Sequence, residues 1–533
     1  MHTLFAQSAS ANTLAPFIQL AGENVWQALT PEIGVAVLAL AVLVFELTLP
    51  EKWRHFIPNG VLIGLLGLTA GLLTGLRTPV NTAPAVLFGG LVTQTRGVIS
   101  GGMPSTTFLR MFFLVSAFFV VWLGVRFLEK RQLPRTEFLH IVLVVTAALM
   151  LLVQSNHFVL LFVALETVTV GFYVLTGYNR GNVDSLEAGV KYLVSGGVSS
   201  ALMLFGIVLL YGTAGNPVLN GGASGADALG FSFLAEFISA HPANPLVLAG
   251  VALVTGGIAF KIGMFPFQIW VPDVYQGAPM PTTAFLAVAS KTAGILTLLI
   301  LVNGPFSGVM VLEGGSPGPL YWLLSVMTGA TLIFSNLTAL GQVNVKRLMG
   351  LSGISHAGFM LLAVLASQTE TGHALAVPAL AVYLVAYLAG AFATFGVMNE
   401  MAEDEDASQS TADFQLLPKR NPFLAGILGC GLGSLAGIPP SLGFVAKFLV
   451  ITAAFASGLW WLSAVALLCV GAGVYYYFAW LREAFQRMWL SGERVRELAE
   501  PVQVPLATRL ALGCLALVIL VGGVARGVVD AFW

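Results

Sequence analysis

The stretch Phe260-Lys261-Ile262-Gly263-Met264-Phe265-Pro266-Phe267-Gln268-Ile269-Trp270-Val271-Pro272-Asp273-Val274-Tyr275 places a lysine and a proline inside one apolar run. A lysine at the centre of a bilayer costs about 3 kcal/mol on insertion scales, so it normally faces protein or water and marks an ion pathway. Pro266 removes a backbone donor, which a membrane helix tolerates where neighbours or cavity water satisfy the freed groups. The stretch therefore predicts a broken membrane helix with a functional charge beside the break.

The composition around this stretch is that of a polytopic membrane protein. The 533 residues are 57% hydrophobic and only 9% charged, and the mean hydropathy is +0.88. Cys430, Cys469 and Cys514 lie singly in apolar spans without CxxC or CxxH spacing, which predicts neither a metal site nor a disulfide framework. The sequence contains no Walker-type loop, cluster motif or dinucleotide fingerprint, which argues against ATP, iron–sulfur or NAD chemistry within this chain. We also expect no nucleic-acid partner and no cleaved signal sequence.

Apolar runs of about 20 residues predict fourteen membrane spans in an all-α fold. The twelfth run is too long for one simple crossing and is interrupted by Gly437-Ile438-Pro439-Pro440-Ser441-Leu442-Gly443, so we interpret it as one broken helix. The expected spans are 31–49, 58–76, 106–127, 138–154, 155–177, 185–211, 246–270, 281–302, 319–339, 346–366, 373–399, 420–457, 459–483 and 506–528.

The distribution of the 24 Lys and Arg residues supports this count. With fourteen spans, the odd-numbered connections and adjoining helix ends hold Lys52, Arg54, Arg126, Lys130, Arg131, Arg135, Arg180, Lys346, Arg347, Lys419, Arg420, Arg482, Arg487, Arg494, Arg496 and Arg509. The other face holds only Arg77, Arg96, Arg110 and Arg526. By the positive-inside rule the odd connections are cytoplasmic, and both termini lie on the periplasmic side of a bacterial inner membrane. The 212–245 connection is then external, and the acidic run from Glu400 to Asp406 is interpreted as a solvated cytoplasmic loop.

The two expected broken helices, spans seven and twelve, contain Pro266 and the pair Pro439-Pro440. They lie five spans apart, so they cross the membrane in opposite directions, as in an inverted-topology repeat. We therefore predict an N-terminal three-helix segment and two inverted five-helix repeats, followed by a C-terminal helix. The corresponding ranges are 1–135, 136–303 (spans 4–8), 304–485 (spans 9–13) and 486–533.

Six ionisable residues lie near mid-span or in the first turns of these apolar helices, and they are the candidate site. Lysine is used at these depths and arginine is not; a buried lysine can release its proton, whereas arginine stays charged. A row of lysines with one central glutamate could therefore relay protons laterally through a hydrated seam. The six residues are Glu166, Lys191, Lys261, Lys291, His356 and Lys447.

Structural roles compete with this interpretation at some positions. Glu187 and Lys191 share a helix face at i,i+4 and could be a structural pair. His356 lies beside serines and could be a satisfied polar core residue. The run Tyr475-Tyr476-Tyr477 is most simply interfacial or packing aromatics. The three central lysines have no comparably cheap structural explanation.

At these residues the chain resembles the antiporter-like membrane subunits of proton-pumping NADH–quinone oxidoreductase (respiratory complex I), which are related to subunits of cation/proton antiporters. The Pro-Asp-Val-Tyr-x-Gly-Ala-Pro form and the Lys-Phe after the twelfth-span break are similar to the N-type subunit. The motifs that carry the resemblance are Leu165-Glu166, Glu187-Ala188-Gly189-Val190-Lys191-Tyr192, Trp270 to Pro279, Asn344-Val345-Lys346-Arg347-Leu348 with Ser355-His356, and Gly437-Ile438-Pro439-Pro440 with Gly443-Phe444 and Lys447-Phe448.

The resemblance implies a fourteen-helix subunit with no cofactor of its own; NAD, FMN, iron–sulfur clusters and quinone would belong to partner subunits. It implies that Glu166 and Lys261 form the charge pair of one half-channel and that Lys291 is the central relay. Lys447 would lead toward the second half-channel, with His356 between. Where the family pattern has a histidine, this chain has Gln268, which cannot titrate. The implied partners are other membrane subunits, including neighbouring antiporter-like subunits, together with the lipid bilayer and protons.

Two other functions fit the same residues. A cation/proton antiporter subunit would use the lysines and Glu166 for ion exchange without redox input. A scaffold subunit would use the charged axis only for packing or for passing electrostatic signals. The N-type motifs favour a proton-translocating subunit driven by redox chemistry elsewhere in a complex.

Overall fold

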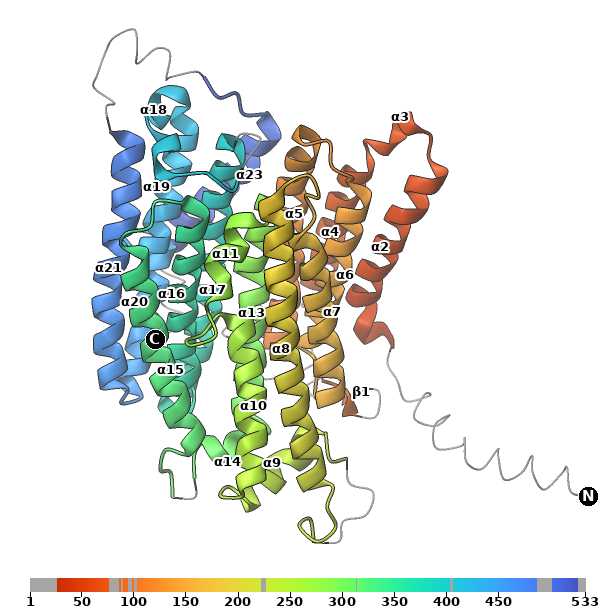
Figure 1. The fold of residues 1–533 in the computed structure, drawn as a ribbon, viewed down its shortest axis with the longest axis vertical. Coiled ribbons are helices and arrows are strands. Elements are labelled where there is room, and N and C mark those ends of the chain that lie inside the picture. Colours follow the sequence, from red (N-terminus) through yellow and green to blue (C-terminus); the bar gives the residue numbers. More distant parts are fainter. Residues whose placement is uncertain are drawn as a thin grey trace, which may run out of the picture.

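The long helices of the protein lie side by side with their axes roughly aligned, and the described strands are very short (Figure 1). This computed structural model describes residues 26–75, 86–87, 90–93, 98–99, 103–221, 227–312, 314–402, 406–486 and 501–525. The described strands form two antiparallel hairpins, β1 (Val86–Leu87) with β2 (Val92–Thr93) and β3 (Val98–Ile99) with β4 (Met103–Pro104). The protein is therefore all-helical in architecture, as the sequence predicts.

Twelve of the described helical segments are long and apolar enough to cross a membrane, which makes this a polytopic membrane protein. Each coincides with an expected span. They are α2 (Thr30–Thr48), α4 (Ile57–Gly75, preceded by α3, Glu51–Arg54), α5 (Ser105–Lys130), α7 (Phe158–Thr176), α8 (Val183–Ala214), α10 (Pro245–Ile262), the run of α12 (Met280–Phe285), η3 (Leu286–Ser290) and α13 (Lys291–Val302), α15 (Pro319–Ala339), α16 (Val345–Ala366), α17 (Glu370–Met401), α21 (Trp460–Phe485) and α23 (Leu506–Val524).

The two remaining expected spans are shorter apolar helices. Span four is α6 (Thr136–Leu152), which has 17 residues. Span twelve is the pair α19 (Pro422–Ala436) and α20 (Leu442–Ala456), so the expected interruption is present. The other short elements are η1 (Trp26–Leu29), α9 (Phe231–Ala240), α11 (Trp270–Gly277), α14 (Ser307–Met310), η4 (Thr411–Phe414) and α18 (Leu417–Arg420).

Successive connections alternate between the two ends of the bundle. In Figure 1, α3 and α18, from the first and eleventh connections, lie at one end, whereas β1, α9 and α14, from even connections, lie at the other. This is the arrangement that the span count requires. The chain ends 1–25 and 526–533 lie outside the described residues, as do Arg77, Arg96, Arg487, Arg494, Arg496 and Arg526.

The first helix break begins at a glycine. α10 ends at Ile262, and Gly263 takes the left-handed conformation with φ +77°, which an L side chain rarely adopts. The amide of Met264 donates to the carbonyl of Ala259 at 2.8 Å, closing the helix end. Pro266 lies in the non-helical link and helix resumes at Trp270, so the expected end of span seven at 270 is wrong. A sequence window cannot see that a second helix, α11, follows the link and runs to Gly277.

The second break repeats this construction. α19 ends at Ala436, Gly437 has φ +81°, and the amide of Ile438 donates to the carbonyl of Gly433 at 3.0 Å. Ser441 then caps α20, because its side chain accepts from the amide of Phe444 at 3.3 Å. In each break a proline, Pro266 or Pro440, follows the left-handed glycine by three residues.

The core of the molecule surrounds α16, every residue of which is buried except Arg347. The run from Met280 to Val302 is also largely buried, whereas α2 and α4 expose most of their surfaces. α15, α17, α11, α20 and α13 pack around α16. The two helices that carry His356 and Lys291 are therefore the ones most shielded from lipid.

One charge assignment from the sequence needs correction. Asp406 is not solvated: its carboxylate lies 3.1 Å from the ammonium of fully buried Lys346. Glu400 is also shielded and forms an ion pair with Arg126; residues 403–405 of the acidic run lie outside the described residues. Arg110, which the sequence assigns to the other face, lies in the second turn of α5, where it is buried and bonds Glu32 through two nitrogens at 2.6 Å. A run of acidic residues indicates a solvated loop only if no cation from a distant part of the sequence pairs with them.

Candidate functional site

Glu166 on α7 and Lys261 on α10 lie close together, as the sequence predicts. Their charged atoms are 3.8 Å apart. Lys261 donates to the hydroxyl of Thr169 at 2.8 Å, and Ser200 donates to Glu166 at 2.6 Å and lies 3.4 Å from the lysine nitrogen. The Lys261 side chain is only 4% exposed and the Glu166 side chain 24%. Hydroxyl groups from two helices therefore bridge a mostly buried charge pair.

Lys291 follows directly on the π-helical turn η3. π turns often occur at functional sites because they displace one residue from the regular α-helical path. The side chain is 1% exposed, and its nitrogen lies 5.4 Å from the centre of the Tyr275 ring and has no hydrogen-bond partner among the described residues. Two glycines make room for it: a Cβ on Gly353 would lie 3.0 Å from the Lys291 Cε, and one on Gly263 would lie 3.5 Å from the nitrogen.

His356 lies one turn after Gly353 on α16, among tyrosines. Its Nδ1 is 2.7 Å from the hydroxyl of Tyr383, and its Nε2 is 3.3 Å from that of Tyr477. The Tyr387 ring packs against the imidazole at 4.8 Å between centroids. The expectation that the 475–477 run serves packing misses this contact, because Tyr477 is buried and joins His356 by a hydrogen bond.

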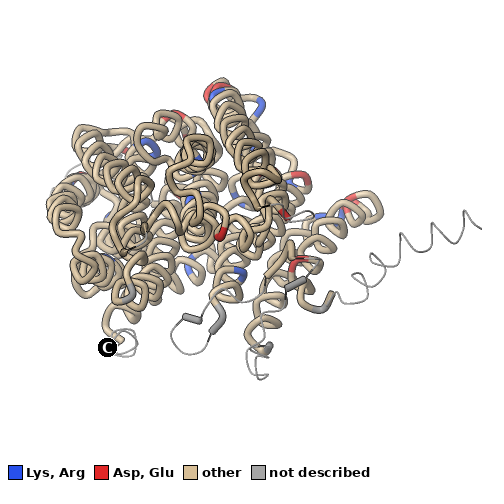
Figure 2. Tube along the Cα trace, turned by 90° about the horizontal axis from the view of Figure 1, so that it is seen from below, with Lys and Arg blue, Asp and Glu red and all other residues tan. Residues whose placement is uncertain are grey.

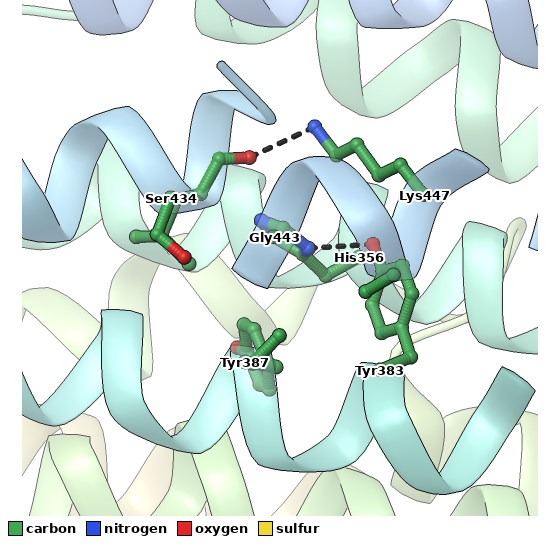
Figure 3. Close-up of a pocket in the computed structure, with 9 residues that line it drawn as sticks. His356, Tyr383, Tyr387, Ser434, Gly443 and Lys447 are labelled. Carbon is green, nitrogen blue, oxygen red and sulfur yellow. Dashed lines mark hydrogen bonds between the residues drawn. The ribbon is translucent and has the colours of Figure 1, made fainter. Parts of the chain in front are cut away.

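Lys447 on α20 reaches back to the end of the preceding half-helix. Its nitrogen donates to the carbonyls of Leu435 and Ala436 at 2.8 and 2.9 Å. These are terminal carbonyls of α19, where the helix dipole favours a cation. Figure 3 shows Lys447 and His356 around one small cavity, with Tyr383 and Tyr387 on the same helix beneath. The cavity has about 10 Å³ for the centre of a water molecule, enough for about one water.

Shared neighbours place these groups in sequence through the core. Gly263, two residues after Lys261, borders the Lys291 ammonium. A Cβ atom on Gly353 would lie 3.0 Å from the Cε atom of Lys291 and also 3.0 Å from the hydroxyl of Tyr387. Gly353 therefore borders both side chains. Tyr387 and His356 both line the cavity of Lys447. Charged positions are sparse along the bundle (Figure 2), which sets this line apart from its apolar surroundings.

Lys191 has a different environment from the other five candidates. Its side chain is 47% exposed and forms ion pairs with Glu187 at 2.7 Å and Asp273 at 3.0 Å. Arg347 approaches Asp273 from another helix at 2.7 Å. The predicted i,i+4 contact is thus present, but Lys191 belongs to an exposed charge network and not to the buried line.

The sequence reasoning missed the hydroxyl groups that surround the charges. Thr169 follows Glu166 by three residues and Tyr387 follows Tyr383 by four, so each pair shares a helix face. That spacing was a usable signal. The partners Ser200 and Tyr477 lie on other helices, and no local pattern brings them to the site. Among the described residues no group of three or more His, Cys, Asp and Glu side chains could hold a metal ion.

The fold and the buried lysines define an antiporter-like polytopic membrane protein, and comparisons agree. Residues 155–472 match the family described as "NADH:quinone oxidoreductase/Mrp antiporter, TM". Subunit N 1 of NADH-quinone oxidoreductase from Opitutus terrae is 48% identical over 514 residues, covering 96% of this chain and 97% of that protein. A chain of respiratory complex I from Thermus thermophilus has a TM-score of 0.70 at 26% identity, covering 94% of this chain and 98% of that chain.

The chain therefore belongs to the NADH:quinone oxidoreductase/Mrp antiporter membrane family and, within it, to the N-type subunits of NADH-quinone oxidoreductase. The Mrp complex of Dietzia sp. DQ12-45-1b also has a similar chain, with a TM-score of 0.75 at 18% identity, covering 95% of this chain and 96% of that chain. That likeness shows a shared fold alone. The 48% identity to a subunit N over nearly the whole chain favours a subunit driven by redox chemistry over a cation/proton antiporter subunit.

Proposed function

We propose that this chain is the N-type membrane subunit of a proton-translocating NADH-quinone oxidoreductase and relays protons along a buried line of side chains. Redox chemistry in other subunits would drive the relay, and this chain would carry out none of it. The members of the line are Glu166, Lys261, Lys291, His356 and Lys447. Lys191 lies outside the buried line, and we propose that it takes part in the relay at the edge of that line through its ion pairs with Glu187 and Asp273.

The observation that carries the proposal is the environment of Lys291. A charged ammonium in a poorly hydrated core is costly unless acceptors or water surround it. Lys291 has an aromatic ring beneath it and two glycines beside it, but no acceptor among the described residues. A structural lysine would be paired, as Lys346 is with Asp406. An unpaired lysine in this position is suited to exchange a proton with transient water.

The helix breaks supply the sites on either side of Lys291. Lys261 lies in the last turn of α10, and Lys447 binds the last carbonyls of α19. The Lys447 ammonium thus lies at a helix C-terminus, where the helix dipole favours a cation, whereas the Lys261 ammonium is held by Thr169 and Glu166. Glu166 can pair with Lys261 at one end of the line, so moving the carboxylate would change where a proton is held.

We further propose fourteen membrane crossings with two inverted five-helix repeats, 136–303 and 304–485, between the segment 1–135 and the C-terminal helix of 486–533. Three correspondences support the repeats. The sixth and eleventh spans, α8 and α17, each have 32 residues. The seventh and twelfth are both broken. Each break has a left-handed glycine followed three residues later by a proline.

The proposed setting is a bacterial inner membrane with both termini on the periplasmic side. The partners would be other membrane subunits, including neighbouring antiporter-like ones, within the lipid bilayer. NAD, FMN, iron–sulfur clusters and quinone would be held by partner subunits. The solved chain from Thermus thermophilus complex I, similar over nearly its whole length, supports assembly of this kind.

Glu166→Ala in the assembled complex tests the relay at its first member. We expect proton pumping and coupled quinone reduction to fall together, because Lys261 loses its carboxylate partner. Gln268→Asn is the matched control: Gln268 is buried in the same broken region but cannot titrate, so pumping should stay near normal. Undiminished pumping by an intact Glu166→Ala complex would contradict the proposal.

A density map of the complex that resolves water provides a second test. We expect ordered water between Lys261 and Lys291 and between Lys291 and His356 in at least one functional state. A dry gap at the same place in every state would exclude a continuous lateral relay.

A further inference from the structure

The pair Glu166–Lys261 and the buried Lys291 are held by different helices. Lys261 faces α7 and α8, where its nitrogen lies 3.4 Å from the Ser200 hydroxyl. Lys291 lies instead against α16 and against the Tyr275 ring of α11. No hydrogen bond among the described residues joins the two lysines. A proton that passes from one lysine to the other therefore needs a group between them.

Tyr192 on α8 is a buried tyrosine close to both lysines' surroundings. Its side chain is 1% exposed. The ring stacks on Trp270 with centroids 4.7 Å apart and meets the Tyr173 ring edge-on at 5.1 Å. These aromatic contacts hold the ring without help from the hydroxyl. Because a buried hydroxyl is costly unless it is hydrogen-bonded, the partner of this hydroxyl is informative.

The side-chain partner of the Tyr192 hydroxyl is Ser290, the residue directly before Lys291. Several buried hydroxyls in the helices of this protein donate to the carbonyl four residues earlier, as Thr297 does to Ala293 at 2.8 Å. Ser290 ends the π-helical turn η3 and makes no such bond among the described residues. Its hydroxyl therefore joins α8 to the turn that carries Lys291.

On its other side, Tyr192 contacts the helix that carries Glu166. Tyr173 follows Glu166 by seven residues, so both lie on one face of α7. The carboxylate interacts electrostatically with Tyr173 and with Tyr192. Gly196 leaves space for the Tyr173 hydroxyl, because a Cβ at that position would overlap it. Tyr192 thus connects the surroundings of the carboxylate with the serine beside Lys291.

We propose that the hydroxyls of Tyr192 and Ser290 form a bridge that passes protons between the Glu166–Lys261 pair and Lys291. This inference rests on the proton relay proposed above and adds two members to it. In each transfer a hydroxyl oxygen accepts a proton from one side and releases its own proton to the other, so neither residue gains or loses a proton overall. Water completes the path at both ends of the bridge.

Tyr192→Phe in the assembled complex tests the bridge, because it removes the hydroxyl and keeps the ring. The rate of proton pumping into sealed vesicles and the rate of coupled quinone reduction should both fall about fivefold, as expected for one lost hydrogen bond. Ser290→Ala should give the same loss. Tyr211→Phe on the same helix is the matched control and should pump as the wild type does, because Tyr211 is 56% exposed.

The double variant Tyr192→Phe, Ser290→Ala separates a shared bridge from two packing defects. Hydroxyls of one bridge act as a unit, so the double variant should lose no more than either single variant. Independent defects would multiply to a loss of about 25-fold, and that result would contradict the bridge. If Tyr192→Phe does not assemble, Ser290→Ala alone decides the question.

A comparison with Lys291→Ala distinguishes this inference from the relay on which it rests. Wild-type pumping by Tyr192→Phe and Ser290→Ala, with a loss in Lys291→Ala, would overturn the bridge and leave the lysine relay in place. Wild-type pumping by all three variants would overturn both. A loss in all three, with normal pumping by Tyr211→Phe, is the result that the bridge predicts.

Discussion

The Tyr383 hydroxyl shows how single residues connect the charged groups. It lies 2.7 Å from His356 Nδ1, and its ring stacks on Phe359 with centroids 6.3 Å apart. The hydroxyl can therefore set the orientation of the imidazole while the ring packs independently. In the proposed relay, a proton that passes between Lys291 and Lys447 would use His356, which this hydrogen bond orients.

Replacing Tyr383 with Phe removes that hydroxyl and keeps the ring. Loss of one hydrogen bond of about 1 kcal/mol should slow proton transfer through this region about fivefold. The measurement is the pumping rate of the reconstituted complex relative to its quinone reduction. Tyr475→Phe is the control, because the Tyr475 side chain is largely exposed. Equal rates in the two variants would remove Tyr383 from the account.

At the residue scale the sequence predicts the charges well and their partners poorly. A lysine in an apolar span is conspicuous, so Lys261, Lys291 and Lys447 all stand out from the sequence alone. The pair Lys346 and Asp406 does not, because one residue begins a helix and the other ends an acidic run 60 positions later. Only the folded chain brings them within 3.1 Å.

At the scale of elements, the two helix breaks determine where charge can be placed. Each break ends a helix in the core: Lys261 lies in the last turn of α10, and Lys447 binds the terminal carbonyls of α19. Proline was the visible signal in the sequence, but the helices actually end just before Gly263 and Gly437, which adopt the left-handed conformation. The expected end of span seven was wrong for this reason: the pattern located the break but not the helix that follows it.

Gly263→Ala tests the first break. Alanine at this position would have to keep the left-handed backbone conformation, which costs about 1–2 kcal/mol for a residue with a side chain. Its Cβ would lie 2.9 Å from the Val271 side chain. It would also narrow the space of Lys291. We expect a lower unfolding temperature of the complex and reduced pumping, measured by thermal scanning and by proton uptake into vesicles.

Gly256→Ala on the same helix is the comparison. Its Cβ would make only ordinary contact, 3.6 Å from the Phe267 ring, and alanine favours helix by about 1 kcal/mol over glycine. Stability and pumping should both be preserved. If Gly263→Ala behaved in the same way, the left-handed glycine would not be needed for the break.

At the scale of the whole molecule, the connections alternate between the two ends of the bundle. α3 and α18 lie at one end, and α9 and α14 at the other (Figure 1). The basic residues of the sequence predicted this division, because the fourteen proposed crossings would separate them into two unequal sets. They could not predict that α16 is the central helix, since apolar spans look alike until they are packed.

Labelling of single cysteines tests the proposed orientation. In a background without Cys430, Cys469 and Cys514, a Lys52→Cys variant should react with a membrane-impermeant maleimide only from the cytoplasmic side. Asn216→Cys, just after α8, should react only from the periplasmic side. Labelling of both positions from one side would contradict the crossing count, and exchanged sides would reverse the orientation.

The central claim is that Lys291 passes protons through the core, and its replacement tests that claim most directly. The measurement is the number of protons pumped per quinone reduced by the intact Lys291→Ala complex in sealed vesicles, together with the rate of coupled quinone reduction. The account predicts that pumping and coupled reduction both fall. Full pumping by a correctly assembled Lys291→Ala complex would show that the buried line is not the proton path.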